Sequence, residues 1–315
     1  MERKVNFIIP YFGTFPNYMQ LFLNSCATNK SFQWTIITDN YTVYNYPNNV
    51  KIVYTTFEEL KKKIQSKFDF EIKLNHPYKF CDMKPMYGYL FEEYNYNFQF
   101  WGYCDIDVIF GNLDKFITKE MLQYDKLFIN GHMTIMRNTE KINKLFMENI
   151  DGNPFYKTVL QSNSSYNFDE EFLDRININT IFQNNDIPVY KDAVIADIYT
   201  KSNFFRICYG LKVEKLKRSF FIWNKGTLTR EVKVKNKWYT EEYMYIHLQK
   251  RKMKIQDNLN HNIYKIIPNK FSNLEIKSNE LGKKNDQVKW FSFNLHYLKL
   301  RTKNLKIKLE RELKK

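Results

Sequence analysis

The sequence of 315 residues contains little of what marks several common protein classes. Its four cysteines are far apart and form no Cys-x-x-Cys pair, which argues against a zinc site or a disulfide framework and fits free thiols in a reducing cytosol. No apolar run approaches the roughly 18 residues of a membrane-spanning helix. The apolar run near the N-terminus is short and interrupted by Pro10, so it does not predict a signal peptide. We therefore expect a soluble or peripheral protein.

Common phosphate-binding motifs are also missing. The sequence has neither a G-x-x-x-x-G-K-[ST] P-loop nor a G-x-G-x-x-G after a predicted strand, and it lacks a G-x-S-x-G nucleophile elbow. Neither a P-loop protein nor a dinucleotide-binding fold is therefore supported. What the sequence does have is 43% hydrophobic residues, with 27 Phe and 23 Tyr, enough for a sizeable core.

The net charge of +15 suggests a nucleic-acid-binding protein, but its distribution weakens that interpretation. Residues 298–315 carry eight Lys or Arg and two Glu, a net charge of +6, so the rest of the chain holds +9. The positive excess is thus concentrated at the C-terminus rather than along an obvious groove. We expect no nucleic-acid partner and keep nucleic-acid binding as an alternative function.

Short apolar runs alternate with helical patterns along the first half of the chain. Predicted strands cover residues 4–13, 32–40, 49–56 and 98–107. Predicted helices cover residues 16–29, 57–68 and 85–94. Residues 126–146 are predicted as strand, Gly-His turn, strand and helix, whereas residues 176–246 mix short strands with basic turns. This alternation predicts an α/β fold with a doubly wound, mostly parallel sheet.

Polar residues interrupt the ends of the predicted strands. In open parallel sheets, ligands bind outside the carboxyl ends of the strands, so these residues are expected to gather at one edge. They are Tyr11, Gly13, Asp39, Asn40, Asp105 and Asp107.

The stretch WGYCDIDVIFGNL places Asp105 and Asp107 two residues apart. An extended chain points residues i and i+2 to the same face, where two carboxylates repel each other unless a cation lies between them. Carboxylates favour hard divalent cations such as Mg²⁺ or Mn²⁺. A metal site is one interpretation, and a pair of aspartates that caps the following turn is the other.

A third metal ligand is available in the stretch YMYIHLQKRKM, which contains His247. An imidazole beside two carboxylates favours Mn²⁺, with Mg²⁺ as the alternative ion. Lys250, Arg251 and Lys252 follow and could neutralise a diphosphate bound by the same metal. The competing interpretation of His247 is a histidine of the core or of an interface.

Six stretches in this order carry a resemblance to a known family: NFIIPYFG, WTIITDN, CDMKP, WGYCDIDVIFGNL, GHMTIMRNT and IHLQKRKM. Over roughly residues 4–255 the chain resembles an uncharacterised bacterial family of polysaccharide-biosynthesis glycosyltransferases with a GT-A fold, which includes capsular galactosyl- and glucosyltransferases. More distantly, it is similar to retaining lipopolysaccharide galactosyltransferases and glycogenin. The resemblance implies a Rossmann-like nucleotide-diphosphosugar transferase domain over residues 1–290.

The resemblance also implies a UDP-galactose or UDP-glucose donor, with Mn²⁺ held by Asp105, Asp107 and His247. Residues implied along the nucleotide or near the uracil are Pro10, Tyr11, Gly13, Asp39 and Asn40. Lys84 would approach the diphosphate or the ribose, although ordinary packing would also account for it.

The acidic stretch FDEEFLD resembles the segment beneath the donor sugar in the retaining enzymes, which makes Asp169 and Glu170 the implied catalytic residues; a solvated helix face is the alternative. Gly131 and His132 match the turn that lines the sugar and acceptor cleft. The retaining enzymes carry His-x-x-Gly-x-x-Lys, but here Lys250 follows His247 with no intervening glycine. The sequence therefore does not decide which of Lys250, Arg251 and Lys252 would bind the diphosphate. It also does not decide whether the transfer retains or inverts the configuration at the anomeric carbon.

Residues 291–315 form a separate basic extension. Leu298, Leu305, Leu309 and Leu313 recur at helical spacing among lysines and arginines, which predicts an amphipathic helix at an anionic membrane surface. A solvated terminal helix packed on the domain is the alternative. We expect a peripheral protein at the cytoplasmic face of the membrane, with a polyprenyl-diphosphate-linked glycan as acceptor. A non-catalytic glycan-binding relative of the fold is a further alternative.

Overall fold

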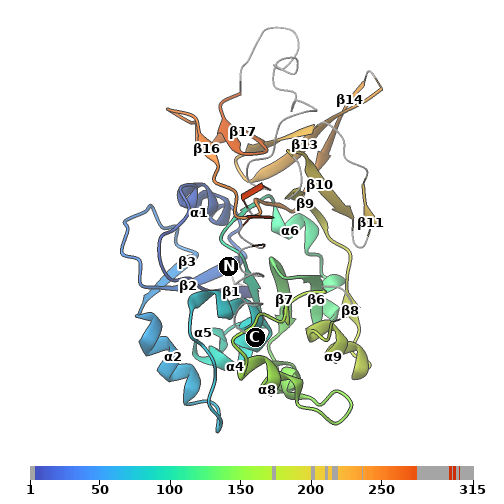
Figure 1. The fold of residues 1–315 in the computed structure, drawn as a ribbon. Coiled ribbons are helices and arrows are strands. Elements are labelled where there is room, and N and C mark those ends of the chain that lie inside the picture. The colour runs from blue at the N-terminus through green and yellow to red at the C-terminus, as the bar shows by residue number, and fades with distance from the viewer. Residues whose placement is uncertain are drawn as a thin grey trace. The chain divides into compact units, whose positions relative to one another are not determined.

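The computed structural model describes residues 4–171, 175–199, 203–209, 212–214, 219–235 and 237–274, together with residues 298, 299, 301, 302 and 305. The chain divides into two compact units (Figure 1). Unit 1 comprises Met1–Val108 and Leu113–Ala193, and unit 2 comprises Ile109–Asn112 and Val194–Lys315. The domain boundary predicted at residue 290 falls outside the described residues and stays a prediction.

In the described part of unit 1, seven strands form one mixed sheet in the order β3-β2-β1-β4-β7-β6-β8. The first four are parallel to one another, β7 is antiparallel to both β4 and β6, and β8 is parallel to β6. The α/β class is therefore confirmed. The strands are β1 (Val5–Pro10), β2 (Phe32–Thr38), β3 (Val50–Tyr54), β4 (Phe100–Cys104), β6 (Lys126–Asn130), β7 (Met133–Arg137) and β8 (Val189–Tyr190).

The helices of unit 1 follow the sequence patterns in part. Helices α1 (Met19–Ala27) and α2 (Phe57–Gln65) confirm two predictions, and α2 begins with a capping box between Thr56 and Glu59. The other short helices, in chain order, are α6 (Leu113–Phe116), η3 (Met121–Gln123), α7 (Glu140–Lys144), η4 (Leu145–Met147), α8 (Phe155–Leu160) and α9 (Ile178–Asn184). Helix α9 lies in a region predicted as strands and turns, and it begins with a capping box at Asn177.

The single helix predicted over residues 85–94 is wrong. The segment breaks into short pieces, because Pro85 lacks a backbone N–H and restricts the residue before it. Gly88 also packs so closely on Trp101 that an added Cβ would lie 2.3 Å from the indole Nε1. The pieces in this range are η2 (Lys84–Met86), α4 (Tyr87–Leu90) and α5 (Glu92–Asn95), and two further short helices, η1 (Pro77–Lys79) and α3 (Phe80–Met83), precede them.

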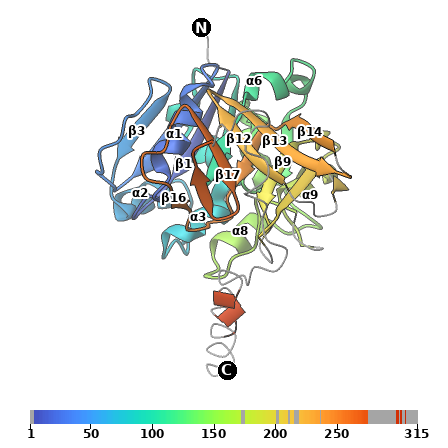
Figure 2. The same cartoon turned by 90° about the horizontal axis from the view of Figure 1, so that it is seen from above.

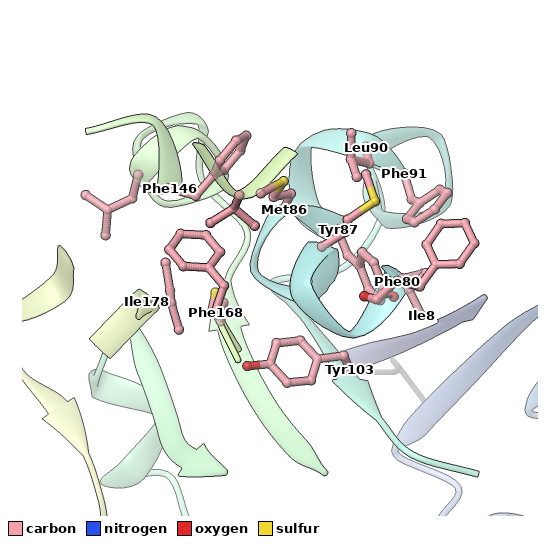
Figure 3. Packing of buried hydrophobic residues seen from close by; sticks show 14 of the residues in the cluster. Ile8, Phe80, Met86, Tyr87, Leu90, Phe91, Tyr103, Phe146, Phe168 and Ile178 are labelled. Atoms are coloured by element: carbon pink, nitrogen blue, oxygen red, sulfur yellow. Dashed lines mark hydrogen bonds between the residues drawn. The ribbon is translucent and has the colours of Figure 1, made fainter. Parts of the chain in front are cut away.

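A hydrophobic core joins this broken helical segment to the sheet. Figure 3 shows Phe80 and Tyr87 near Ile8 of β1, with Met86 and Phe168 toward the other side of the cluster. Phe168 is fully buried and directly precedes Asp169. The core therefore fixes the backbone of the acidic stretch that the sequence singled out.

Unit 2 contains two sheets in its described residues. One has the order β11-β10-β9-β15-β5 and the other β14-β13-β12-β17-β18-β16; β12, β13 and β14 lie side by side in Figure 2. The first sheet consists of β5 (Val108–Phe110), β9 (Val194–Ile198), β10 (Phe205–Tyr209), β11 (Lys212–Val213) and β15 (Tyr245–His247). The second consists of β12 (Ser219–Asn224), β13 (Thr227–Val234), β14 (Lys237–Glu242), β16 (Lys254–Ile255), β17 (Ile263–Ile267) and β18 (Lys270–Ser272).

The predicted amphipathic helix at residues 291–315 lies largely outside the described residues. Leu298 and Leu305, which are described, are exposed, and the Thr302 hydroxyl donates to the Leu298 carbonyl at 3.0 Å. Among the residues that the structure describes, no helix has the length and apolar character needed to cross a bilayer.

Candidate functional site

Lys84 is the centre of a buried cluster in unit 1. Its ammonium group donates to Asp105 Oδ1 at 2.7 Å and to the Gly131 carbonyl at 2.6 Å, and it lies 3.3 Å from Asp169 Oδ2. These four residues, hereafter the Lys84 cluster, come from four segments: η2, the residues just after β4, the β6–β7 turn and the acidic stretch. The fold thus brings together four residues that the sequence analysis had singled out.

The charges of the Lys84 cluster shift one another's pKa. Burial alone would lower the pKa of Lys84, but the carboxylates of Asp105 and Asp169 outweigh it and raise that pKa. Burial, together with the nearby Glu170 and Asp105, raises the pKa of Asp169 to about 7 against the opposing charge of Lys84. Lys84 therefore stays cationic, while Asp169 can hold or release a proton near neutral pH, a property typical of functional carboxyl groups.

A second buried ion pair, between Lys79 and Asp82, fixes the backbone that leads into the acidic stretch. Asp82 accepts hydrogen bonds from the backbone N–H groups of Tyr166 at 3.0 Å and Phe168 at 3.5 Å, and it pairs with Lys79 at 2.9 Å. Both Lys79 and Asp82 are buried. Residues 168–170 form a turn and a bend with Asp169 buried, so the alternative of a solvated helix face does not hold for Asp169.

Position 131 requires a glycine, because two carboxyl groups lie too close to it for a side chain. Its N–H donates to Glu170 Oε2 at 3.2 Å. A Cβ added at this position would lie 2.7 Å from Asp169 Oδ2 and 2.9 Å from Glu170 Oε2. The absence of a side chain therefore lets both carboxyl groups reach the turn between β6 and β7, which explains why a glycine stands beside His132.

Asp105 and Asp107 follow β4 rather than forming its end, because the strand stops at Cys104. The predicted strand over residues 98–107 extends three residues beyond the carboxyl end of β4, so the argument from alternating strand faces does not apply to this pair. The Asp105 N–H still donates to the His132 carbonyl at 3.0 Å, which keeps the two turns in register. Asp107 is buried, and its charge adds to burial in raising the pKa of Tyr18.

The loops after β1 and β2 also meet. The Gly13 N–H donates to Asp39 Oδ1 at 2.8 Å, and the Asn40 side-chain amide donates to the Gly13 carbonyl at 2.8 Å. Gly13 has a φ of 98°, a conformation that favours glycine. Tyr11, just after Pro10, stacks on Phe15 with ring centroids 5.2 Å apart. The predicted gathering of these residues at the ends of β1 and β2 is confirmed.

In unit 2, His247 is oriented by Asp197. The two residues face each other across the parallel strands β15 and β9, and His247 Nδ1 lies 2.9 Å from Asp197 Oδ1. Metal-binding histidines commonly donate their other ring N–H to a carboxylate in this way. The sequence analysis missed Asp197; an aspartate inside the apolar strand VIADI was the available signal.

The basic residues after His247 have different roles. Arg251 is buried and donates to the Tyr199 carbonyl at 2.9 Å and to Asn269 Oδ1 at 3.2 Å, so its guanidinium group stabilises unit 2. Lys250 and Lys252 are exposed. Lys250 stands at the glycine position of the expected motif and has a φ of 53°, the left-handed conformation that glycine favours. Lys250 and Lys252 remain the candidates for a diphosphate ligand.

One family matches most of the chain. The match to the "Family of unknown function (DUF6625)" covers residues 7–275. The chain belongs to DUF6625. The matched part begins in β1 and ends after β18, so it includes the Lys84 cluster and the Asp197–His247 pair. No curated protein matches the chain.

This DUF6625 chain also contains a buried lysine that the sequence analysis missed. Lys126 donates to the Phe128 carbonyl and, at 2.7 Å, to Asn179 Oδ1. Phe128 has a φ of 69°, and the β6–β7 register shifts between Leu127 and Asn130. Lys126 therefore braces an irregular strand that leads directly to Gly131. Burial lowers the pKa of Lys126 to about 7.

We predict that Gly131→Ala destabilises the protein by about 1–3 kcal/mol, the usual cost of overpacking. The added methyl group would collide with the carboxyl groups of Asp169 and Glu170. Chemical unfolding of Gly131→Ala, Asp169→Ala and the double variant measures the coupling. The cost of the alanine should be smaller in the Asp169→Ala background, and an equal cost in both backgrounds would refute the explanation.

We also predict a pH-dependent stability difference between the native protein and Lys126→Met. The native protein releases the Lys126 proton near its pKa of about 7, whereas the unfolded chain keeps it up to the ordinary value of 10.5. Since the unfolded state binds more protons between these values, rising pH stabilises the native protein relative to the variant, by about 1 kcal/mol per pH unit. Denaturant unfolding from pH 6 to 9.5 checks this, with the exposed Lys119→Met as the control. A constant difference for Lys126→Met would contradict it.

Proposed function

We propose that this DUF6625 chain is a metal-dependent hexosyltransferase. It would move galactose or glucose from a UDP-sugar to a polyprenyl-diphosphate-linked glycan in bacterial capsule or other surface polysaccharide synthesis, with a GT-A type fold. The observation that carries the proposal is the Lys84 cluster, together with its position. Asp105 follows β4, and the loops of Gly13 and Asp39 follow the parallel strands β1 and β2. Ligands bind at this edge of open α/β sheets.

The donor nucleotide fits the polar groups along this edge. Asp39 is exposed and can accept a hydrogen bond from the N3–H of uracil, while Tyr11 offers an aromatic face. The buried ammonium group of Lys84 supplies positive charge beside Asp105. Lys250 and Lys252, both exposed, are candidates for a second contact with the diphosphate.

Mn²⁺ fits the proposed ligands Asp105, Asp107 and His247 by their chemistry. Two carboxylates and one imidazole suit Mn²⁺ better than Mg²⁺, which prefers oxygen ligands. The Nδ1 contact with Asp197 orients the imidazole of His247, as is common for a metal ligand. When bound, the metal would neutralise the diphosphate leaving group.

Asp169 and Glu170 are the proposed catalytic residues. In the transfer, the bond between the anomeric carbon and the diphosphate oxygen breaks, and a bond to an acceptor hydroxyl oxygen forms while that hydroxyl loses its proton. Asp169 has a pKa of about 7 and contacts Lys84, and Glu170 contacts Gly131. Both carboxyl groups are therefore held where they can bind sugar hydroxyls, and either can accept a proton.

The proposal predicts that UDP stabilises the protein only when Mn²⁺ is present. At 100 times its dissociation constant, UDP should add about 2.7 kcal/mol of stability. Asp107→Ala should abolish this gain, while Asp114→Ala, at an exposed position, should keep it. Thermal unfolding with Mn²⁺ and UDP, each alone and together, measures the effect. An equal stabilisation of Asp107→Ala by UDP and Mn²⁺ would contradict the proposed metal site.

The same protein, incubated with Mn²⁺ and either UDP-galactose or UDP-glucose, should release UDP from one of them. UDP release is measured by a coupled assay, with Asp107→Ala as the inactive control. Binding of the UDP-sugar without any release would instead support the non-catalytic glycan-binding alternative. Salt-sensitive binding of nucleic acid, without a response to UDP, would support the nucleic-acid alternative.

We further propose that the basic C-terminal segment holds the enzyme at the cytoplasmic face of the membrane. Each basic residue near an anionic surface contributes about 1 kcal/mol, and residues 298–315 have a net charge of +6. Deletion of residues 295–315 should release the protein from phosphatidylglycerol liposomes in a sedimentation assay and spare UDP release. Equal liposome binding by the truncated protein would contradict this role.

A further inference from the structure

A cavity of about 470 Å³ in unit 1 has no part in the proposed donor site. It is lined mainly by helix α9, the residues on either side of it, and β8, which are labelled in Figure 1. Its volume falls within the range of roughly 300–1,000 Å³ that is common for small-molecule sites. Its lining includes Asn177, Asn179, Thr180 and Gln183 from the α9 region.

The cavity borders the Lys84 cluster. Asp169 belongs to that cluster, whereas Glu171, two residues further along the chain, lines the cavity. Two residues of extended chain span at most about 7 Å. Asn179 gives a second link, because it accepts from Lys126, which braces the strand leading to Gly131. Glu171 on the cavity wall and Asp169 in the cluster both act on the charge of Lys126, so a ligand in this cavity would lie near the acidic stretch.

The lining suits a hydroxyl-rich ligand. Amide groups both donate and accept hydrogen bonds, and a threonine hydroxyl does the same. Asn177 and Asn179 are buried and bond to each other, to the Arg175 carbonyl and to Lys126, so these two amides hold the cavity wall rigid. The exposed Gln183 amide is a lining group that can both donate to and accept from a ligand. Pro188 and Val189 add an apolar surface for the C–H face of a sugar ring.

The charges along the cavity largely offset one another. Glu171 and Lys191 lie 3.8 Å apart and both are partly exposed, so they form an ion pair that a ligand hydroxyl can bridge. Arg175 leaves a single further positive charge. This balance favours a neutral saccharide over a strongly charged ligand such as a diphosphate.

We propose that this cavity binds the saccharide part of the acceptor glycan, adjacent to the hexose that is transferred. The inference rests on the proposed function, because the cavity is assigned to the acceptor by its position next to Asp169 and Glu170. It names the ligand class as a neutral sugar ring or a short saccharide.

The test compares two tryptophan substitutions on exposed positions of α9. Gln183 lines the cavity and Asn184 does not, so Gln183→Trp should fill the space and Asn184→Trp should leave it open. Saturation-transfer NMR with galactose, glucose, N-acetylglucosamine and lactose is recorded on the full chain and both variants. At least one sugar should bind the native protein and Asn184→Trp, with affinity at least ten-fold lower for Gln183→Trp.

A second readout separates this inference from the proposed function. Stabilisation by Mn²⁺ and UDP should be the same in the native protein and both variants, which also shows that they fold. Sugar binding that is absent from the native protein, or equal in the two variants, would overturn the cavity assignment even where UDP binds. Sugar binding lost only in Gln183→Trp, without any response to UDP, would keep the cavity as a saccharide site and refute the hexosyltransferase.

Discussion

A single buried ammonium group organises the candidate site of unit 1. Lys84 bonds to Asp105 and to the Gly131 carbonyl and contacts Asp169, so it links the loop after β4, the β6–β7 turn and the acidic stretch. Removing one partner of a buried ion pair typically costs about 3–5 kcal/mol, whereas replacing the whole pair by apolar groups is often neutral. A buried ion pair is therefore weak evidence for a gain in stability, and what the contacts of Lys84 do show is that two carboxyl groups are held at fixed positions.

Other parts of unit 1 maintain this arrangement without touching Lys84. Asp82 and Lys79 hold the backbone before Asp169, Phe168 anchors it in the core, and Lys126 braces the strand before Gly131. Supporting residues of this kind restrict the positions of the side chains in a site, as functional sites generally require. One of these supporting residues, Lys126, also bonds to Asn179, which lines the cavity beside α9.

The sequence predicted the elements whose signal is local. The apolar runs of β1, β2 and β3 and the patterns of α1 and α2 were sufficient, because burial imposes a periodic pattern on such segments. Strand ends were less certain, as β4 shows by stopping before Asp105. The roles of Asp82 and Lys126 were missed, because Asp82 also bonds to backbone N–H groups more than 80 residues away and Lys126 to a side chain 53 residues away. Asp197 gave a local signal, an aspartate inside an apolar strand, but its partner His247 lies 50 residues further along the chain. Helix α9 was not predicted because it has only seven residues. Its sequence does contain a helix-capping residue, Asn177, and apolar residues at helical spacing, namely Ile178, Ile181 and Phe182.

The pairing of His247 with Asp197 lies on one rung of the parallel strands β15 and β9. Its geometry is therefore set by the internal hydrogen bonding of unit 2 rather than by any incoming ligand. A slip of one residue between these strands would turn the two side chains to opposite faces and abolish the pair. The imidazole thus loses its conformational entropy during folding, and a ligand that binds it later meets a ring whose orientation is already fixed.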